Sequence, residues 1–127
     1  MPKQAVSVLG ATGYTGGLIV RELRRRGVAC VAGGRDAVKL QALAQSIGDI
    51  ETLQVDVHDA ASLARFAERS KVVINCVGPF VDHGEAVVRA AIEHGAHYLD
   101  TTGEQPFMKA MLEHDEWARR QNVAVVS

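Results

Sequence analysis

The sequence has no excess of charge of either sign. Lysine and arginine total 14 against 15 aspartate and glutamate residues, which gives a formal net charge of −1. So balanced a chain has no broad basic surface with which to hold nucleic acid or an anionic membrane. The one basic run, 24–26, stands at the end of an expected helix. Cations there complement the negative end of the helix dipole, so we interpret the run as structural.

Long apolar runs are also missing. No segment approaches the roughly 20 apolar residues that a membrane-spanning helix needs. The N-terminus has the pattern of a strand running into glycines, which is not that of a signal peptide. These two absences favour a cytoplasmic protein.

Cysteine is scarce, since Cys30 and Cys76 are the only two in the chain. Both fall in expected strands that flank a third strand, which places them about 9–10 Å apart. A disulfide needs Cα atoms within roughly 7 Å. We therefore expect two buried free thiols and no disulfide.

What the sequence does contain is an alternation of short apolar runs with longer helix-periodic stretches. Hydrophobic residues make up 47% of the 127 residues, enough for the core of one domain spanning 1–127. Continuously apolar runs are typical of parallel strands that are covered on both faces. The six expected strands are Ala5–Leu9, Val28–Gly33, Ile50–Val55, Val72–Cys76, His97–Asp100 and Val123–Val126.

Five helices are expected between these strands, and several of their ends carry recognisable signals. Asp36 and Asp59 occupy N-cap positions before the second and third helices. Asp82 and Glu85 form a D-x-x-E capping pattern at the start of the fourth helix.

The fifth helix is expected to begin near Pro106, which suits a first helical turn, and to end at Arg119 and Arg120. Met111 and Leu112 belong to its apolar side. Strands that alternate with helices form a parallel sheet with helices on both faces, and right-handed crossovers leave few topologies. The sequence therefore predicts an α/β fold, a doubly wound parallel sheet of the Rossmann type with six strands in the order 3-2-1-4-5-6.

A glycine-rich turn, GATGYTG at 10–16, follows the first strand and opens the first helix. Glycines allow the turn's dihedral angles and let a phosphate approach backbone N–H groups, while the helix directs its positive end at the phosphate. The spacing is G-x-x-G-x-x-G, with Thr12 where the second glycine of G-x-G-x-x-G would stand. Its place at the head of a strand–helix–strand unit favours dinucleotide binding over a merely tight turn.

The end of the second strand distinguishes NAD from NADP, because an acidic residue there binds the ribose 2′-hydroxyl and an arginine accommodates a 2′-phosphate. Arg35 follows Gly16 at close to the expected spacing of about 20 residues, and its guanidinium can bind a phosphate through two hydrogen bonds. We therefore expect NADP and interpret Asp36 as a helix cap. The alternatives are a solvated Arg35 without a ligand, and NAD if Asp36 reaches the ribose. Asp56, after the third strand, is a candidate for the adenine side or, equally, a turn residue.

The fourth strand lies across the switch point from the first, so its carboxyl end faces the middle and the nicotinamide half of a bound dinucleotide. Asn75, Gly78, Pro79 and Phe80 are expected to wall that side, unless they form a simple strand-ending turn. No activating base stands beside Cys76 in the sequence. We expect Cys76 to pack in the core rather than to act as a nucleophile.

The fifth strand also ends in a polar segment. Asp100, Thr102 and Glu104 either form part of a substrate mouth or cap the helix that follows.

Two catalytic patterns are absent from the sequence. The five histidines show no metal-ligand spacing, and the closest pair, His94 and His97, is interrupted by Gly95, so no metal site is expected. Tyr14 and Tyr98 lack the lysine four residues on with which short-chain dehydrogenases lower a tyrosine pKa. That enzyme class is therefore disfavoured.

Four segments resemble the NADP-binding domain of saccharopine dehydrogenase-like oxidoreductases, a group that includes trans-acting enoyl reductases of lipid synthesis. They are GATGYTG at 10–16, GGRD at 33–36, VINCVGPF at 73–80 and HYLDTTGE at 97–104, and the resemblance extends over essentially the whole chain. The resemblance implies phosphate contacts by Gly10, Thr12, Gly13, Tyr14, Thr15 and Gly16, an adenosine-phosphate contact by Arg35, and a nicotinamide side lined by Asn75, Val77, Gly78 and Pro79.

The resemblance further implies a function, which is to orient NADP for hydride transfer to or from a C=N, C=O or C=C bond of a small molecule. In that family a second domain after the sixth strand supplies most substrate contacts. We expect no such domain within these 127 residues, so the chain alone is expected to be inactive even if its parent is an oxidoreductase. The alternative is a non-catalytic module that senses NADP and regulates a partner. An apolar last strand at the sheet edge predicts self-association, for example as a homodimer.

Overall fold

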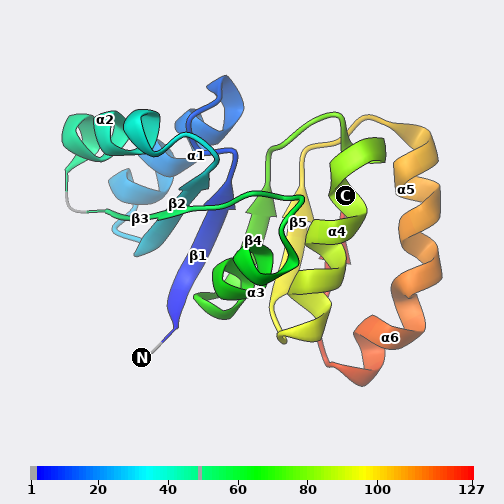
Figure 1. The fold of residues 1–127 in the computed structure, drawn as a ribbon. Helices are drawn as coiled ribbons and strands as arrows, with labels where there is room; N and C mark the ends of the chain where they lie inside the picture. Colours follow the sequence, from blue (N-terminus) through cyan, green and yellow to red (C-terminus); the bar gives the residue numbers. More distant parts are fainter. Residues whose placement is uncertain (1–2, 49) are drawn as a thin grey trace.

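The computed structural model describes residues 3–48 and 50–127, and strands alternate with helices along it (Figure 1). Neighbouring strands are all parallel, and the sheet has the order β3-β2-β1-β4-β5-β6. The expected fold class and strand order are confirmed. The strands are β1 (Gln4–Leu9), β2 (Cys30–Gly34), β3 (Glu51–Gln54), β4 (Ser70–Asn75), β5 (His97–Asp100) and β6 (Val125–Val126). The helices are α1 (Tyr14–Arg25), α2 (Ala37–Ile47), α3 (Ala60–Glu68), α4 (Phe80–Glu93), α5 (Gln105–Met111), the 3₁₀ turn η1 (Leu112–His114) and α6 (Asp115–Arg120).

The last helical segment departs most from the expectation. In place of one continuous helix up to Arg120, the chain forms α5, the 3₁₀ turn η1 and then α6. Leu112, which was expected on the apolar side, is 75% exposed, while Met111 is buried. The inward placement of Leu112 was wrong because a 3₁₀ turn has about 3.0 residues per turn, which shifts the side chains away from their α-helical positions.

Two strands begin two residues later than their apolar patterns predict, in each case because the end of the preceding helix hydrogen-bonds the first of those residues. The N–H of Val28 donates to the carbonyl of Leu23 in α1, so β2 begins only at Cys30. The N–H of Val123 donates to the carbonyl of Ala118 in α6, which shortens β6 to two residues.

The two faces of the sheet are covered by different helices (Figure 1). On one face, Val31, Val73 and Tyr98 pack in one cluster with side chains of α3, α4, α5 and α6. On the other face, Val8 and Ala32 pack with side chains of α1 and α2. These two clusters form the core on either side of the sheet.

The second face is covered over only part of its width. A row of paired residues crosses the sheet from Val8 in β1 through Ile74 and Leu99 to Val126 in β6. Val8 is fully buried, Leu99 is 37% exposed and Val126 is 52% exposed. The described helices therefore leave the β5–β6 part of this face bare, although parallel sheets are usually covered on both faces. We call this surface the open half-face.

Two of the three expected helix caps are present. The carboxylate of Asp36 accepts hydrogen bonds from N–H groups in the first turn of α2, and that of Asp59 does the same for α3. The third, at the start of α4, differs and is described with the site below.

Some features expected from composition can be compared directly with the structure. Cys30 and Cys76 are free thiols, as predicted, but only Cys30 is buried, while Cys76 is partly exposed. Arg25 and Arg26 both pair with Glu22 in the preceding turn, which agrees with a structural role for the basic run. Among the described residues no helix is long and apolar enough to cross a membrane.

Candidate functional site

The glycine-rich turn is held firmly against the neighbouring strand. The carbonyl oxygen of Gly33 accepts hydrogen bonds from the N–H groups of both Gly10 and Ala11, each at 3.0 Å. The N–H of Gly13 then donates to the carbonyl of Gly10 at 3.1 Å. Gly10 has φ +79°, which a residue with a side chain rarely adopts. The turn is therefore a fixed feature between β1 and α1.

The first turn of α1 comes very close to the turn that precedes it. A Cβ on Gly16 would lie 2.0 Å from the carbonyl oxygen of Gly10, a distance that no side chain tolerates. At Gly13 the nearest atom to a Cβ would be that same oxygen at 3.4 Å, an ordinary contact. Glycine is therefore required at Gly16 by packing, whereas at Gly13 the fold itself does not require it.

Backbone donors are left open at this point of the chain. Helix α1 has Gly13 as its N-cap, without a side-chain cap and without an acidic residue in its first turn. Within the described parts of the chain, no acceptor is bonded to the N–H groups of Thr12, Tyr14, Thr15 and Gly16. The side chains of Tyr14 and Thr15 are exposed and do not fill the turn. Open N–H groups at the positive end of a helix are a site for an anion such as a diphosphate.

A cavity of about 220 Å³ lies beside the turn, at the carboxyl ends of the first four strands. We call it the strand-end cavity. It brings together half of the twelve residues predicted for cofactor binding, namely Gly10, Thr12, Arg35, Asp56, Val77 and Gly78. Four others, Gly13, Tyr14, Thr15 and Gly16, form the adjacent turn and helix start.

Asp36 has the capping role that the sequence indicated, and the guanidinium of Arg35 beside it is left without a described protein partner. Asp36 Oδ1 accepts hydrogen bonds from the N–H groups of Val38 and Lys39, at 3.0 and 3.2 Å, and so is committed to capping α2. The Arg35 side chain is exposed at the rim of the cavity, and no described residue pairs with its guanidinium. A cation without a protein partner is therefore available to a ligand phosphate.

Asp56 is a turn residue, which was one of the two roles expected for it. It also lines the strand-end cavity. Its Oδ1 accepts a hydrogen bond from the N–H of His58 at 2.9 Å, which closes an Asx turn. Its own N–H donates to Ser62 Oγ at 3.0 Å. The carboxylate thus fixes the loop between β3 and α3.

Asn75 lies beneath the β4 turn rather than on the cavity wall. Its side chain is fully buried, and its Oδ1 accepts a hydrogen bond from the N–H of Val77 at 3.0 Å. Its Nδ2 donates to the hydroxyl of Tyr98 at 3.3 Å, and that hydroxyl donates to Asp100 at 2.7 Å. Asn75 therefore shapes the turn that carries Val77. Pro79, two residues after Val77, is the N-cap residue of α4.

The start of α4 is capped by a residue that the sequence did not indicate. Asp82 and Glu85 do not cap it, so that prediction was wrong. The carboxylate of Glu104 accepts hydrogen bonds from the N–H groups of Phe80 and Val81, at 2.8 and 3.1 Å. A cap from outside the helix satisfies the same donors, so no local motif was needed.

The polar segment after β5 is therefore an internal scaffold. The N–H of Thr102 donates to Asp100 Oδ1 at 3.1 Å, and the N–H of Glu104 donates to Thr102 Oγ1 at 3.0 Å. Glu104 in turn caps α4, as described above. The expected cap on the following helix is therefore wrong, because α5 has no side-chain cap and Glu104 binds the start of α4 instead. The substrate mouth stays a prediction.

Two titratable groups near the ends of β4 and β5, Cys76 and Tyr98, are held in their neutral forms. Burial, with a smaller effect of the nearby Asp100 carboxylate, raises the pKa of the Cys76 thiol to about 11. Burial and the hydrogen bond to Asp100 also raise the pKa of Tyr98 well above its ordinary value. Cys76 thus packs as expected, and neither group is activated for proton transfer at neutral pH.

Sequence reasoning missed two histidines of the strand-end cavity. His58 and His83 were considered only as metal ligands, yet both line this cavity, and their rings meet edge to face with centroids 5.2 Å apart. Nothing in their spacing along the chain marks this contact. In the described parts of the chain, no group of three or more histidine, cysteine or acidic residues is arranged to hold a metal ion.

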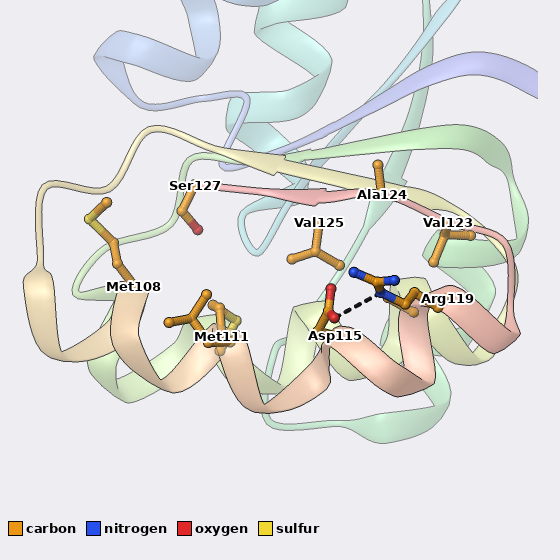
Figure 2. A pocket seen from close by; sticks show the side chains of 10 residues that line it. Met108, Met111, Asp115, Arg119, Val123, Ala124, Val125 and Ser127 are labelled. Atoms are coloured by element: carbon orange, nitrogen blue, oxygen red, sulfur yellow. Dashed lines mark hydrogen bonds and ion pairs between the residues drawn. The ribbon is translucent and has the colours of Figure 1, made fainter.

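A larger cavity of about 410 Å³ lies between α5, α6 and β6 and shares no lining residue with the strand-end cavity (Figure 2). Met108, Met111 and Val125 contribute apolar side chains to it, and the Arg119 side chain donates to Asp115 within it at 2.9 Å. The residues that line this larger cavity include no glycine-rich turn and no helix N-terminus with unbonded N–H groups. Its chemistry does not suit a dinucleotide, so the smaller strand-end cavity is the better candidate.

The comparison with protein families decides what this site belongs to. A model of the saccharopine dehydrogenase NADP binding domain matches residues 6–126. The chain belongs to this family. NADP is therefore the cofactor of the domain, as Arg35 after the second strand had suggested.

Known relatives of this NADP-binding domain are considerably longer. A lipid droplet localized protein of Caenorhabditis elegans is 36% identical over 140 residues, covering 100% of this chain and 33% of the relative. A saccharopine dehydrogenase-like oxidoreductase of Mus musculus is 33% identical over 138 residues, covering 94% of this chain and 32% of the relative. The chain thus spans about a third of the length of these curated relatives.

Solved structures share the fold of this NADP-binding domain. The apo saccharopine dehydrogenase (L-Glu forming) of Saccharomyces cerevisiae superposes with a TM-score of 0.80 at 21% identity, covering 96% of this chain and 26% of that one. At this level of identity the likeness supports the fold.

The residues present fit an NADP molecule. The open N–H groups at the start of α1 suit a diphosphate, and the close packing at Gly16 keeps side-chain atoms away from them. Arg35 suits a 2′-phosphate, and the strand-end cavity next to it has room for the adenosine end.

Proposed function

We propose that this domain holds NADPH for hydride transfer in an oxidoreductase. A second body of protein, meaning another domain or another polypeptide chain, binds the substrate. The observation that carries the proposal is the family match over residues 6–126, in a chain that spans about a third of its curated relatives. The Mus musculus relative is named an oxidoreductase, which supports the reaction class.

Each part of the cofactor has a counterpart among the residues described. The N–H groups of Thr12 and of residues 14–16 hold the diphosphate, and the guanidinium of Arg35 binds the 2′-phosphate. The β4 turn at Val77 and Gly78, supported from below by Asn75, lies towards the nicotinamide. When bound, the nicotinamide supplies or accepts the hydride, and these residues bind and orient it.

Proton transfer to the substrate requires a group from elsewhere. Of the ionisable groups near the β4 turn, the thiol of Cys76 and the phenol of Tyr98 both have raised pKa values and stay protonated at neutral pH. Asp100 is already engaged as a hydrogen-bond acceptor. We infer that the second body of protein brings the acid or base as well as the substrate pocket.

The open half-face supports the presence of such a second body. Leu99 and Val126 lie on it at the β5–β6 side of the sheet, the side on which the doubly wound order places the nicotinamide half. Leu18, 51% exposed on α1, adds apolar surface on the side of the sheet that α1 and α2 cover. Protein packed there would cover these side chains and bring its own groups close to the cofactor.

The test measures binding and turnover separately. Calorimetry with the 127-residue chain is expected to show NADPH binding that is tighter than NADH binding. The chain alone should not oxidise NADPH with imine, carbonyl or enoyl substrates, whereas a longer polypeptide that carries it should. Absence of binding to either dinucleotide would refute the proposal. Binding without turnover in the longer polypeptide would favour the NADP-sensing alternative.

A further inference from the structure

One ring nitrogen in the strand-end cavity lacks a partner. His83 lies in the first turn of α4, and its Nδ1 is shielded from solvent without a hydrogen bond to any described residue. A polar atom removed from water without a partner is unfavourable, and such atoms in folded proteins usually await a ligand or a water molecule. Because His83 lines the cavity, a ligand in the cavity lies beside its ring, and a small rotation of the ring would bring Nδ1 to the ligand.

The orientation of His83 is set by a short series of contacts. The Asp56 carboxylate accepts a hydrogen bond from the N–H of His58, which fixes the loop after β3. The ring of His58 then meets the ring of His83 at an interplanar angle of 77° and a centroid distance of 5.2 Å. This edge-to-face contact holds the His83 imidazole in place.

The position of the cavity indicates which part of NADP reaches His83. The diphosphate belongs at the open N–H groups of α1, and the 2′-phosphate belongs at Arg35 on the end of β2. The remaining space runs from there between the loops that follow β3 and β4. Val57 gives it an apolar wall on the β3 side, Val77 closes it where it meets the β4 turn that continues towards the nicotinamide, and the two histidines also line it. A flat heterocycle with polar edges suits such a slot.

We propose that His83 hydrogen-bonds the edge of the adenine base of bound NADP and makes the site selective for adenine, with His58 as the residue that positions it. The inference rests on the proposed function, since it requires NADP in this cavity. His83 Nδ1 accepts a hydrogen bond from the 6-amino group of adenine. In this arrangement His83 has the tautomer with its proton on Nε2, in which Nδ1 is an acceptor. Hypoxanthine carries an oxygen in place of the amino group and cannot donate to that nitrogen.

The test is a cycle of two proteins and two ligands. Calorimetry measures NADPH and its hypoxanthine analogue, deamino-NADPH, with the wild-type chain and with His83→Phe, which keeps a flat ring and removes both nitrogens. The wild type should bind NADPH up to about tenfold more tightly than the analogue, the effect of one hydrogen bond. In His83→Phe the two ligands should bind about equally. His83→Asn, whose amide can replace Nδ1, should restore most of the preference for NADPH.

The outcomes separate this inference from the proposed function. Equal preference for NADPH in the wild type and in His83→Phe would overturn the role of His83 while leaving NADP binding intact. Failure of the wild type to bind NADPH at all would overturn both. A circular dichroism melting curve shows whether His83→Phe is folded. If it is not, the wild-type and His83→Asn measurements decide, and the absence of any preference for NADPH in both overturns the inference.

Discussion

Gly10 and Gly16 touch so closely that the carbonyl oxygen of the first lies 2.0 Å from where a Cβ of the second would be. This contact folds the start of α1 back on the end of β1. The N–H groups of Thr12 and of residues 14–16 have no hydrogen-bond partner among the described residues. The packing of two glycines thus creates the feature on which cofactor binding depends.

A matched pair of substitutions tests this contact. Gly16→Ala forces a methyl group into the Gly10 carbonyl, so overpacking should cost about 1–3 kcal/mol of unfolding free energy or more. For a domain of this size that lowers the melting temperature by roughly 4–12 °C. Gly13→Ala meets only an ordinary contact and should change the melting temperature by no more than about 2 °C. Equal effects in thermal unfolding would contradict the geometry.

The Arg35→Ala substitution tests the choice between NADP and NAD. Loss of a charge-assisted contact with the 2′-phosphate should weaken NADPH binding by about 1.5–3 kcal/mol, or roughly 10- to 150-fold. NADH lacks that phosphate, so its affinity should change little. Arg120→Ala, at the far end of α6, is the control and should affect neither ligand. Equal losses for both dinucleotides in calorimetry would exclude Arg35 from the phosphate site.

The raised pKa of Cys76, at the β4 turn, leads us to expect a loss of stability at alkaline pH. The Cys76 thiol has a pKa of about 11 in the folded state against an ordinary 9.0, so the folded chain binds more protons than the unfolded chain between these values. Stability should therefore fall as pH rises from 9 to 11, with about 2 kcal/mol due to Cys76. Urea unfolding of the wild type and of Cys76→Ala at several pH values measures this, and identical pH slopes would refute it.

The open half-face predicts self-association of the domain alone. Apolar surface that lacks its usual cover pairs readily with another copy, and the short edge strand β6 adds unpaired backbone groups. Light scattering of the concentrated chain should show dimers or larger species. Leu99→Lys together with Val126→Lys should restore the monomer, whereas Leu112→Lys, exposed at the α5–α6 side, should not. A monomeric wild type would argue against this surface as an interface.

The features that the sequence revealed are those with local causes. The strand order followed from alternating strand and helix patterns, and the cap at Asp36 followed from its place directly before a helix. The turn at 10–16 was recognisable because the glycines needed for close packing are near one another in the chain. For the cap and the turn, the signal lies within a few residues of the structure that it specifies, whereas the strand order needs the pattern of the whole chain.

The features that escaped prediction depend on contacts between distant segments. Glu104 caps the helix that begins at Phe80, 24 residues earlier, and no short motif encodes such a pairing. The contact between His58 and His83 arises because the β3 and β4 loops meet at one edge of the sheet. The break at Leu112 interrupts a helix whose apolar pattern is continuous, so that pattern gave no sign of it.

The account depends most on the backbone amides between β1 and α1. Heteronuclear NMR of the ¹⁵N-labelled chain, titrated with NADPH, observes them individually. The amides of Thr12, Tyr14, Thr15 and Gly16 should show the largest chemical-shift changes, with smaller changes near Arg35. If NADPH at millimolar concentration leaves those four amides unmoved, while other regions shift or nothing shifts at all, the cradle for the diphosphate does not exist as described.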